Sequence, residues 1–307
     1  MHRSTSTSSF ASEESAVAWA DRSERPTSPT YRRTTRCFRQ ALVASVEAAL
    51  RVEREPQGAL HDFRRGVRDA RAVLAACKSL LPTEGFLELQ ATLRAVTRAT
   101  GAMRDRDALP EVLASLPTAI GATEARAALE SRLLVDRFAS RQPRQRARRL
   151  AVAAAKVTPL ADRFDELLPR DFTPVQLRAG WQRLAKRARK AAKAAARAPD
   201  AVPTVHTARK RLRQLGAALR LLAKRDTRAA RRAPRLARLA AKLGETLDCA
   251  RLAEVAQRTA LHDPTVMADG AAVELAATLE RRSGARRAKL LQATRHMLAR
   301  RRWKSRA

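Results

Sequence analysis

From about residue 31 onward, apolar residues recur every three to four positions, with charged residues between them. This spacing is typical of amphipathic helices, and no stretch has the period-two alternation of a half-buried strand. Short segments marked by Pro or Gly interrupt the pattern and are expected to be turns. They lie near residues 56–58, 82–85, 117–121, 143, 169–174, 199–203, 234 and 264–270. The sequence therefore predicts an all-α protein.

Two ordered sequence blocks occur twice along the chain. The block that begins at His61 matches the block that begins at His206, at an offset of 145 residues. A second block matches at an offset of 143 residues and pairs Leu93, Gly101, Asp105 and Leu109 with Leu236, Gly244, Asp248 and Leu252. Two matches in the same order favour an internal duplication. We predict two homologous helical halves, residues 31–170 and 171–307.

The first 30 residues differ from the rest of the chain. They are rich in Ser, Thr and Glu, which predicts a disordered tail over residues 1–30. No stretch has the ~20 apolar residues that span a bilayer, so no membrane insertion is expected. The cysteines Cys37, Cys77 and Cys249 are odd in number and far apart, which favours neither a disulfide framework nor a zinc site. We expect a cytoplasmic protein without a metal or cofactor.

Each half contains a helix with one cationic face and one apolar face. At 100° per residue, the first cationic face gathers His61, Arg64, Arg65, Arg68 and Arg71. The second gathers His206, Arg209, Lys210, Arg213, Arg220 and Lys224. The apolar faces hold Phe63, Val67, Ala70, Leu74, Cys77 and Leu81 in the first helix, and Ala208, Leu212, Leu215, Leu219 and Leu222 in the second.

Cations stacked on one helix face repel one another, at about a few tenths of a kcal/mol per neighbouring pair. We expect Asp62 and Asp69 to point away from the face, so that no acid offsets this repulsion. An anion with several charges would stabilise it, because each phosphate accepts charge-assisted hydrogen bonds from Arg, Lys and protonated His. The alternative interpretation is a solvated face on a very basic protein.

The overall charge sharpens the choice of ligand. Lys and Arg total 63 against 30 Asp and Glu, a formal net charge of +33. Such a chain favours polyanionic partners, namely nucleic acid, acidic lipid or polyphosphate. The opening helix of each half is also basic and could form further walls of a binding groove. Its candidate residues are Arg32, Arg36 and Arg39 in the first half, and Arg183, Arg187 and Lys190 in the second.

These residues resemble the CHAD family, named for conserved histidines in an α-helical domain. The motif His-x-x-Arg with basic residues one and two turns on matches His61 and Arg64, and its partner motif Leu-Gly-x-x-Arg-Asp-x-Asp matches residues 100–107, Thr-Gly-Ala-Met-Arg-Asp-Arg-Asp. The later copy is degenerate, since Leu247 replaces the motif arginine Arg104. Gly216 stands where the first half has Arg71, and Pro110 is expected to interrupt the helix after the motif.

The resemblance covers about residues 31–302. It implies two pseudo-twofold-related helical bundles that form one domain, with a basic central groove or channel that binds inorganic polyphosphate. The residues that it places in this groove are His61, Arg64, Arg68, Arg71, His206, Arg209, Lys210 and Arg213. Association with polyphosphate granules is one cellular setting that fits such a protein, and stress regulation and enzyme recruitment stay open beside it.

Binding without catalysis is the function that these features favour. No P-loop or Ser/His/Asp signature is present, and we interpret Asp105, Asp107 and Asp248 as residues that orient helices and hold arginines. The alternative is a nucleic-acid-binding, chromatin-like basic protein, and nucleic acid stays open as a competing polyanion. Against it, aromatic residues make up only 4% of the chain, too few for stacking on single-stranded bases. The sequence leaves the oligomeric state open.

Overall fold

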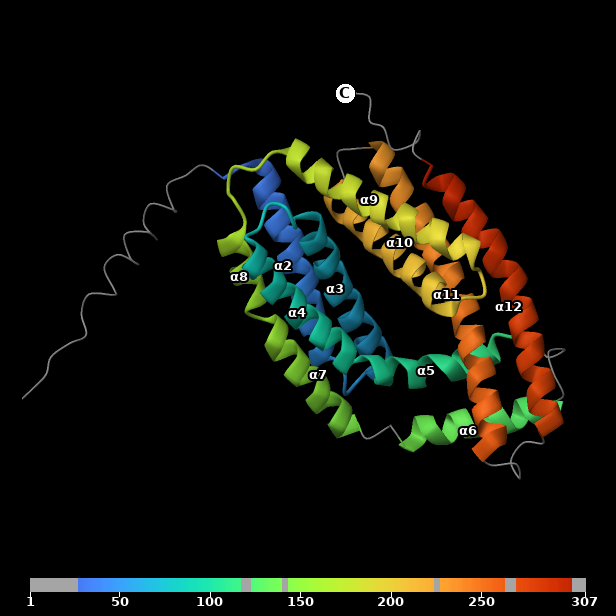
Figure 1. Cartoon of the computed structure of the whole chain (residues 1–307). Helices are drawn as coiled ribbons and strands as arrows, with labels where there is room; N and C mark the ends of the chain where they lie inside the picture. Colours follow the sequence, from blue (N-terminus) through green and yellow to red (C-terminus); the bar gives the residue numbers. More distant parts are fainter. Residues whose placement is uncertain (1–26, 117–122, 140–142, 224–226, 263–268, 300–307) are drawn as a thin grey trace, which may run out of the picture.

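The computed structural model describes residues 27–116, 123–139, 143–223, 227–262 and 269–299. These residues form an all-α protein and contain no β-strand, as the hydrophobic pattern predicts. The helices pack side by side in two groups, one drawn in blue to green and the other in yellow to red in Figure 1.

The first half of the chain forms the blue to green group. Its helices are α2 (Pro29–Leu50), α3 (Pro56–Ala76), α4 (Thr83–Ala99), α5 (Gly101–Ala114), α6 (Thr123–Ala139), α7 (Pro143–Val157) and α8 (Leu160–Leu167). Helix α2 begins two residues before Tyr31, where we expected helical periodicity to start. The Ser28 side chain caps it by accepting a 3.0 Å hydrogen bond from the Tyr31 amide, and Pro29 suits the first turn. The rest of the predicted tail, residues 1–26, lies outside the described residues.

The second half contains fewer and longer helices. They are α9 (Pro174–Arg197), α10 (Val202–Leu222), α11 (Thr227–His262) and α12 (Asp269–Met297). Helix α9 begins like α2, with a proline in its first turn and a hydroxyl cap, here a reciprocal pair between Thr173 and Gln176. Pro29 and Pro174 are separated by the same 145 residues as His61 and His206. The first half breaks between α4 and α5 at Thr100, whereas α11 continues past the matching Leu243.

The main hydrophobic core joins both halves. Helices α3 and α10 pack against each other at its centre, and every residue predicted for their two apolar faces is buried. Helix α9 also crosses the end of α3 closely. A Cβ atom on Gly180 would lie within 3.0 Å of the Ala76 carbonyl, so only glycine allows this approach of the two backbones.

A second, smaller core lies at the far end of the molecule. Helices α5 and α6 of the first half extend to α11 and α12 of the second, as Figure 1 shows. Leu109, Leu113 and Leu129 are buried there against Leu252 and Leu279. Both cores are therefore built from the two halves together.

Two proline predictions were wrong. Pro110 lies inside α5 and Pro234 lies inside α11, although each was expected to break a helix. A proline cannot donate to the carbonyl four residues earlier, so each helix loses one hydrogen bond there. Packing outweighs this loss, because Leu109 and Leu113 flank Pro110 in the second core, and Leu236 follows Pro234 in the main core.

Candidate functional site

Positively charged side chains from both halves gather around α3 and α10. Arg71 of α3 is half-buried, and burial together with the nearby Arg94 and Arg211 lowers its pKa. Burial, Arg187 and Arg94 lower the pKa of Arg211 in the same way. Burial followed by Arg71, Arg211 and Arg213 lowers the pKa of Lys210. We call these six residues the cationic cluster: Arg71, Arg94, Arg187, Lys210, Arg211 and Arg213.

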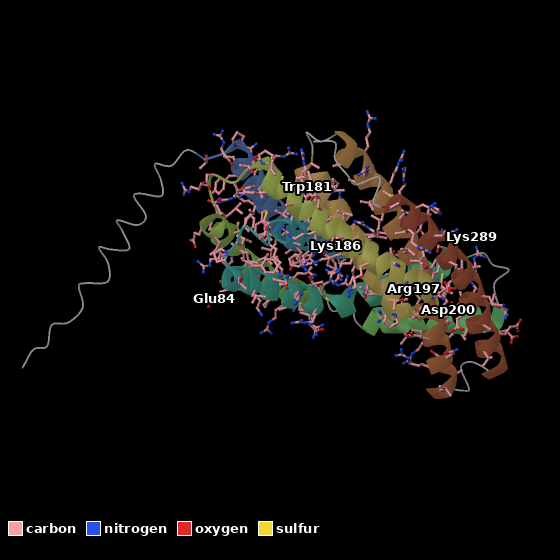
Figure 2. The ribbon with its side chains drawn as sticks, turned by 45° about the horizontal axis from the view of Figure 1, so that its top comes forward. Glu84, Trp181, Lys186, Arg197, Asp200 and Lys289 are labelled. Carbon is pink, nitrogen blue, oxygen red and sulfur yellow. The ribbon has the colours of Figure 1, made fainter. Side chains whose placement is uncertain are left out.

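Four helices supply the cationic cluster. Arg71 lies on α3, Arg94 on α4, Arg187 on α9, and the other three on α10. Figure 1 shows these helices next to one another, with α3 and α10 between α4 and α9. In Figure 2, Trp181, Lys186 and Arg197 mark the course of α9 past this region. The cluster therefore depends on both halves of the fold.

The charges that act on Arg71, Lys210 and Arg211 are all positive. Guanidinium groups keep their charge in proteins, so the arginines cannot relieve the repulsion by losing a proton. Partial burial strengthens the repulsion because water screens the charges less well. An anion that contacts several of these groups at once would remove it.

Two further arginines of the predicted faces hold neighbouring helices in place. Arg64 donates 3.2 Å and 2.9 Å hydrogen bonds to the Thr97 carbonyl and the Thr100 hydroxyl at the end of α4. Arg71 also reaches this helix, through a 3.3 Å bond to the Thr97 hydroxyl. Arg64 thus stabilises the break between α4 and α5.

Arg209 occupies the matching place in the second half. Its guanidinium lies against Gly244 of α11, where a Cβ atom would come within 2.8 Å of three guanidinium atoms. Gly244 matches Gly101, which follows the Thr100 that Arg64 contacts. The glycine of the second motif copy therefore makes room for an arginine, with no turn or unusual backbone conformation at that point.

Two other cations of the predicted faces, Arg65 and Arg220, lie at a different site. A hollow of about 320 Å³ opens between α2, α3 and α10, and Arg65 and Arg220 line it. Arg220 donates a 2.5 Å hydrogen bond to Asp69 across the two halves. Glu47 and Asp62 line the same hollow. Acids therefore balance the cations in this hollow.

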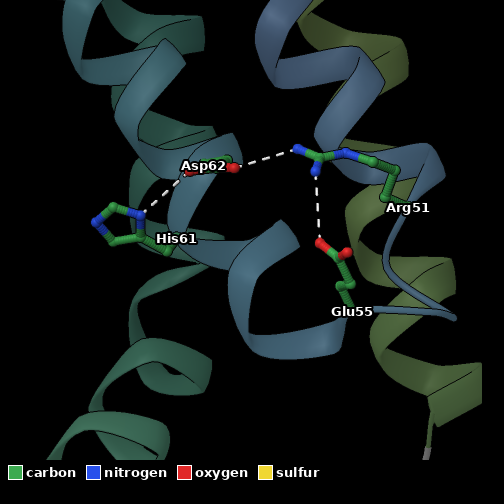
Figure 3. Close-up of polar contacts among 4 residues, drawn as sticks. All are labelled: Arg51, Glu55, His61 and Asp62. Atoms are coloured by element: carbon green, nitrogen blue, oxygen red, sulfur yellow. Dashed lines mark hydrogen bonds and ion pairs between the residues drawn. The ribbon is translucent and has the colours of Figure 1, made fainter.

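The prediction that Asp62 and Asp69 point away from the cations was wrong. Asp69 pairs with Arg220, and Asp62 accepts a 3.1 Å hydrogen bond from Arg51 and contacts His61 Nδ1 at 3.3 Å (Figure 3). Partial burial alone would raise the pKa of Asp62, but the bonds from His61 and Arg51 lower it. The partner of Asp69 comes from the other half, which a wheel of one helix does not include.

Comparison with known proteins identifies the family. The model of the CHAD domain matches residues 33–257 of this sequence. The chain belongs to the CHAD family. Its fold is similar to the CHAD domain from the plant Ricinus communis, with a TM-score of 0.61 and 20% sequence identity over 89% of this chain and 92% of that chain.

A second solved structure is also similar to this CHAD domain. PptA from Streptomyces chartreusis matches with a TM-score of 0.52 and 24% identity, over 91% of this chain and 100% of that chain. At these identities the two structures establish a shared fold only. None of the curated proteins matches this sequence.

The histidines of the CHAD motif are exposed. His61 lies at the start of α3 beside the network of Arg51, Glu55 and Asp62 drawn in Figure 3, and its side chain is 68% exposed. His206 is exposed at the start of α10. Both therefore lie near the first turns of the two packed helices and are accessible to a ligand from solvent.

The predicted cations of α2 and α9 have varied surroundings in the CHAD fold. Arg183 donates a 2.7 Å hydrogen bond to the Ser79 hydroxyl after the end of α3, and Arg39 pairs with Asp162 of α8 at 3.0 Å. Arg32, Arg36 and Lys190 are exposed. Arg68, which belongs to the predicted cationic face of α3, is half-buried. Lys224 lies outside the described residues. Of the α2 and α9 candidates, Arg187 belongs to the cationic cluster, because its charge lowers the pKa of Arg211.

Sequence reasoning missed Arg94 and Arg211. Arg211 lies about 140° from His206 on a helical wheel, which placed it toward the apolar face. The wheel could not show that α10 turns this edge toward Arg94 of α4 and Arg187 of α9. The run of three cations from Arg209 to Arg211 was the available signal.

The CHAD motif acid Asp107 has the structural role that we expected. It accepts a 2.9 Å hydrogen bond from the buried Arg146, which also donates to the Pro56 carbonyl at the start of α3. The side chains of Arg104 and Asp105 lie outside the described part of the structure. Within that part, no group of three or more His, Cys, Asp or Glu residues could hold a metal ion. Every described helix is too short or too polar to cross a membrane.

Proposed function

We propose that this CHAD domain binds inorganic polyphosphate without catalysing its turnover, and that the cationic cluster is its main contact surface. The ligand would run between the two halves, along a groove or channel over α3 and α10. Storage or recruitment at polyphosphate granules would be a natural setting for such a protein.

The observation that carries this proposal is the gathering of six cations from four helices. The pKa values of Arg71, Lys210 and Arg211 are lowered by burial and by other cations. A flexible chain of phosphates offers closely spaced anionic oxygens to all of them. Arginine donates in a planar fork that matches phosphate oxygens, and five of the six residues are arginines. No base needs to be recognised, which agrees with the scarcity of aromatic residues.

Most of the binding free energy would come from the release of counterions from the polyanion, as in nucleic-acid binding. Nucleic acid is therefore the competitor that the test must include. The purified protein is titrated at physiological salt with long polyphosphate, heparin and duplex DNA, at matched charge concentration. We expect polyphosphate to bind most tightly, and tighter binding of DNA would refute the proposal.

The absence of catalysis needs a separate measurement. Long-chain polyphosphate is incubated with the protein, with and without Mg²⁺, and its length distribution is followed on gels. We expect an unchanged distribution. Progressive shortening that depends on the protein would overturn the non-catalytic part of the proposal and leave the binding part standing.

A further inference from the structure

Lys210 differs chemically from the rest of the cationic cluster. It is the one amine among five guanidinium groups, and it is exposed on α10. In the part of the chain that the structure describes, its ammonium group has no hydrogen bond and no ion pair. Its charged neighbours are Arg71 from α3, and Arg211 and Arg213 from α10. Among the described residues, no acid pairs with this ammonium group.

This environment favours a nucleophilic amine. Only the neutral form of a lysine attacks an electrophile, and arginine side chains remain protonated. Partial burial and three neighbouring cations lower the pKa of Lys210, so a larger fraction of its amine is neutral than for an ordinary surface lysine. The same cations attract small anions and raise their local concentration. An acylating agent that is itself an anion would benefit from both effects.

We propose that Lys210 is an acylation site whose acyl donor is an acyl phosphate. The Nζ lone pair attacks the carbonyl carbon of the donor, and a C–N bond forms. The C–O bond to the phosphate then breaks, and orthophosphate leaves with the bonding electrons. The proton released from Nζ goes to water or to the departing phosphate, so the products are an amide and orthophosphate.

Acylation would remove one charge from the cationic cluster. Three arginines would lose a repelling neighbour, and the surface would attract polyanions less strongly. The domain would then bind less polyphosphate when acyl phosphate is abundant. This regulatory consequence rests on the proposed function, whereas the acylation site itself does not.

The experiment measures acetylation of every lysine by mass spectrometry, with acetyl phosphate as the probe on the full chain. Lys156, Lys242 and Lys289 are exposed on other helices and serve as internal controls. We expect Lys210 to react roughly tenfold faster than these three, at the lower end of the range for electrostatic concentration of a ligand. Equal rates at Lys210 and the controls would overturn the proposal.

A second reagent and a second variant identify the cause. The uncharged N-hydroxysuccinimide ester of acetate should favour Lys210 less than acetyl phosphate does, because the cations do not concentrate it. The double variant Arg71→Ala and Arg211→Ala should bring the acetyl phosphate rate at Lys210 toward that of the controls. Circular dichroism checks that this variant is folded. A rate that the variant leaves unchanged would show that the cationic cluster does not promote the reaction.

The regulatory part is tested on its own. Polyphosphate affinity is compared between wild type, Lys210→Gln and the control Lys242→Gln, which removes one exposed charge on α11 outside the cluster. We expect weaker binding for Lys210→Gln than for the control. Fast acetylation of Lys210 with equal affinities for the two variants would overturn the regulation alone. An unmodified protein that binds no polyphosphate would overturn the proposed function alone.

Discussion

The salt dependence of polyphosphate binding tests the cationic cluster directly. The perturbation is the triple variant Arg71→Ala, Lys210→Ala and Arg211→Ala, which removes three of the six charges. Arg64 and Arg209 are left intact, because their guanidinium groups also contact α4 and α11. Arg71 also donates to the Thr97 hydroxyl of α4, so the thermal unfolding of the variant is compared with that of the wild type. An unchanged unfolding midpoint shows that the loss of affinity reports on charge.

The expected magnitude follows from counterion release. For a flexible single-stranded polyanion, each neutralised phosphate contributes about −0.7 to the slope of log K against log salt concentration. Six contacts predict a slope of about −4 for the wild type, and three predict about −2 for the variant, on that same scale. Between ~50 and ~200 mM salt, affinity should then fall roughly 300-fold for the wild type and roughly 20-fold for the variant.

The assay is a polyphosphate titration at four or five salt concentrations. A matched control removes three charges elsewhere, at Arg163, Arg258 and Arg286, which are exposed and paired with Glu88, Glu254 and Glu245. The control should keep a slope of about −4, as expected if all six cluster contacts remain. Equal slopes for the cluster variant and the wild type would refute the reasoning.

Three further predictions concern stability and access. Asp107→Ala removes the ion-pair partner of the buried Arg146 and should lower the free energy of unfolding by about 3–5 kcal/mol, measured by urea denaturation. Asp162→Ala removes the exposed pair with Arg39 and should change the free energy of unfolding by less than about 1 kcal/mol. Burial and the hydrogen bond to Asp165 raise the pKa of Tyr31 to about 12 from 10.0, so the native state favours the neutral phenol. The contribution of the Tyr31 phenol to stability is complete below pH 10 and is lost as the pH rises toward 12. The variant Tyr31→Phe should therefore show a weaker dependence of the free energy of unfolding on pH in this window. Burial raises the pKa of the Cys77 thiol to about 12, so Cys77 should react with a thiol reagent only when the protein unfolds. If Cys77 in the native protein were labelled as fast as the half-buried Cys37, its buried position would be contradicted.

The hydrophobic pattern predicted the fold class and the buried faces of α3 and α10, because a helix buries one face whatever it packs against. Phe63 and Leu212, assigned to the core from their spacing, are both fully buried. Pro110 and Pro234 show the limit of local rules, since tertiary packing keeps both inside helices. The family was also recognised correctly from its duplicated motifs.

The candidate site was harder to predict for a physical reason. A helical wheel arranges residues around one axis, whereas a binding surface is made where several helices meet. Arg65 and Arg71 share one face of α3, yet Arg65 lines the acid-balanced hollow and Arg71 belongs to the cationic cluster. The binding of polyphosphate by these residues stays a prediction.

The second core has a consequence for synthesis on the ribosome. Leu113 is buried against Leu252, which leaves the ribosome 139 residues later, so the second core cannot form until then. At ~5–20 residues per second this delay lasts roughly 7–30 s, during which the apolar sides of α5 and α6 stay exposed. The nascent first half is thus prone to aggregation. A ribosome-associated chaperone that shields residues 101–139 would raise the yield of folded protein.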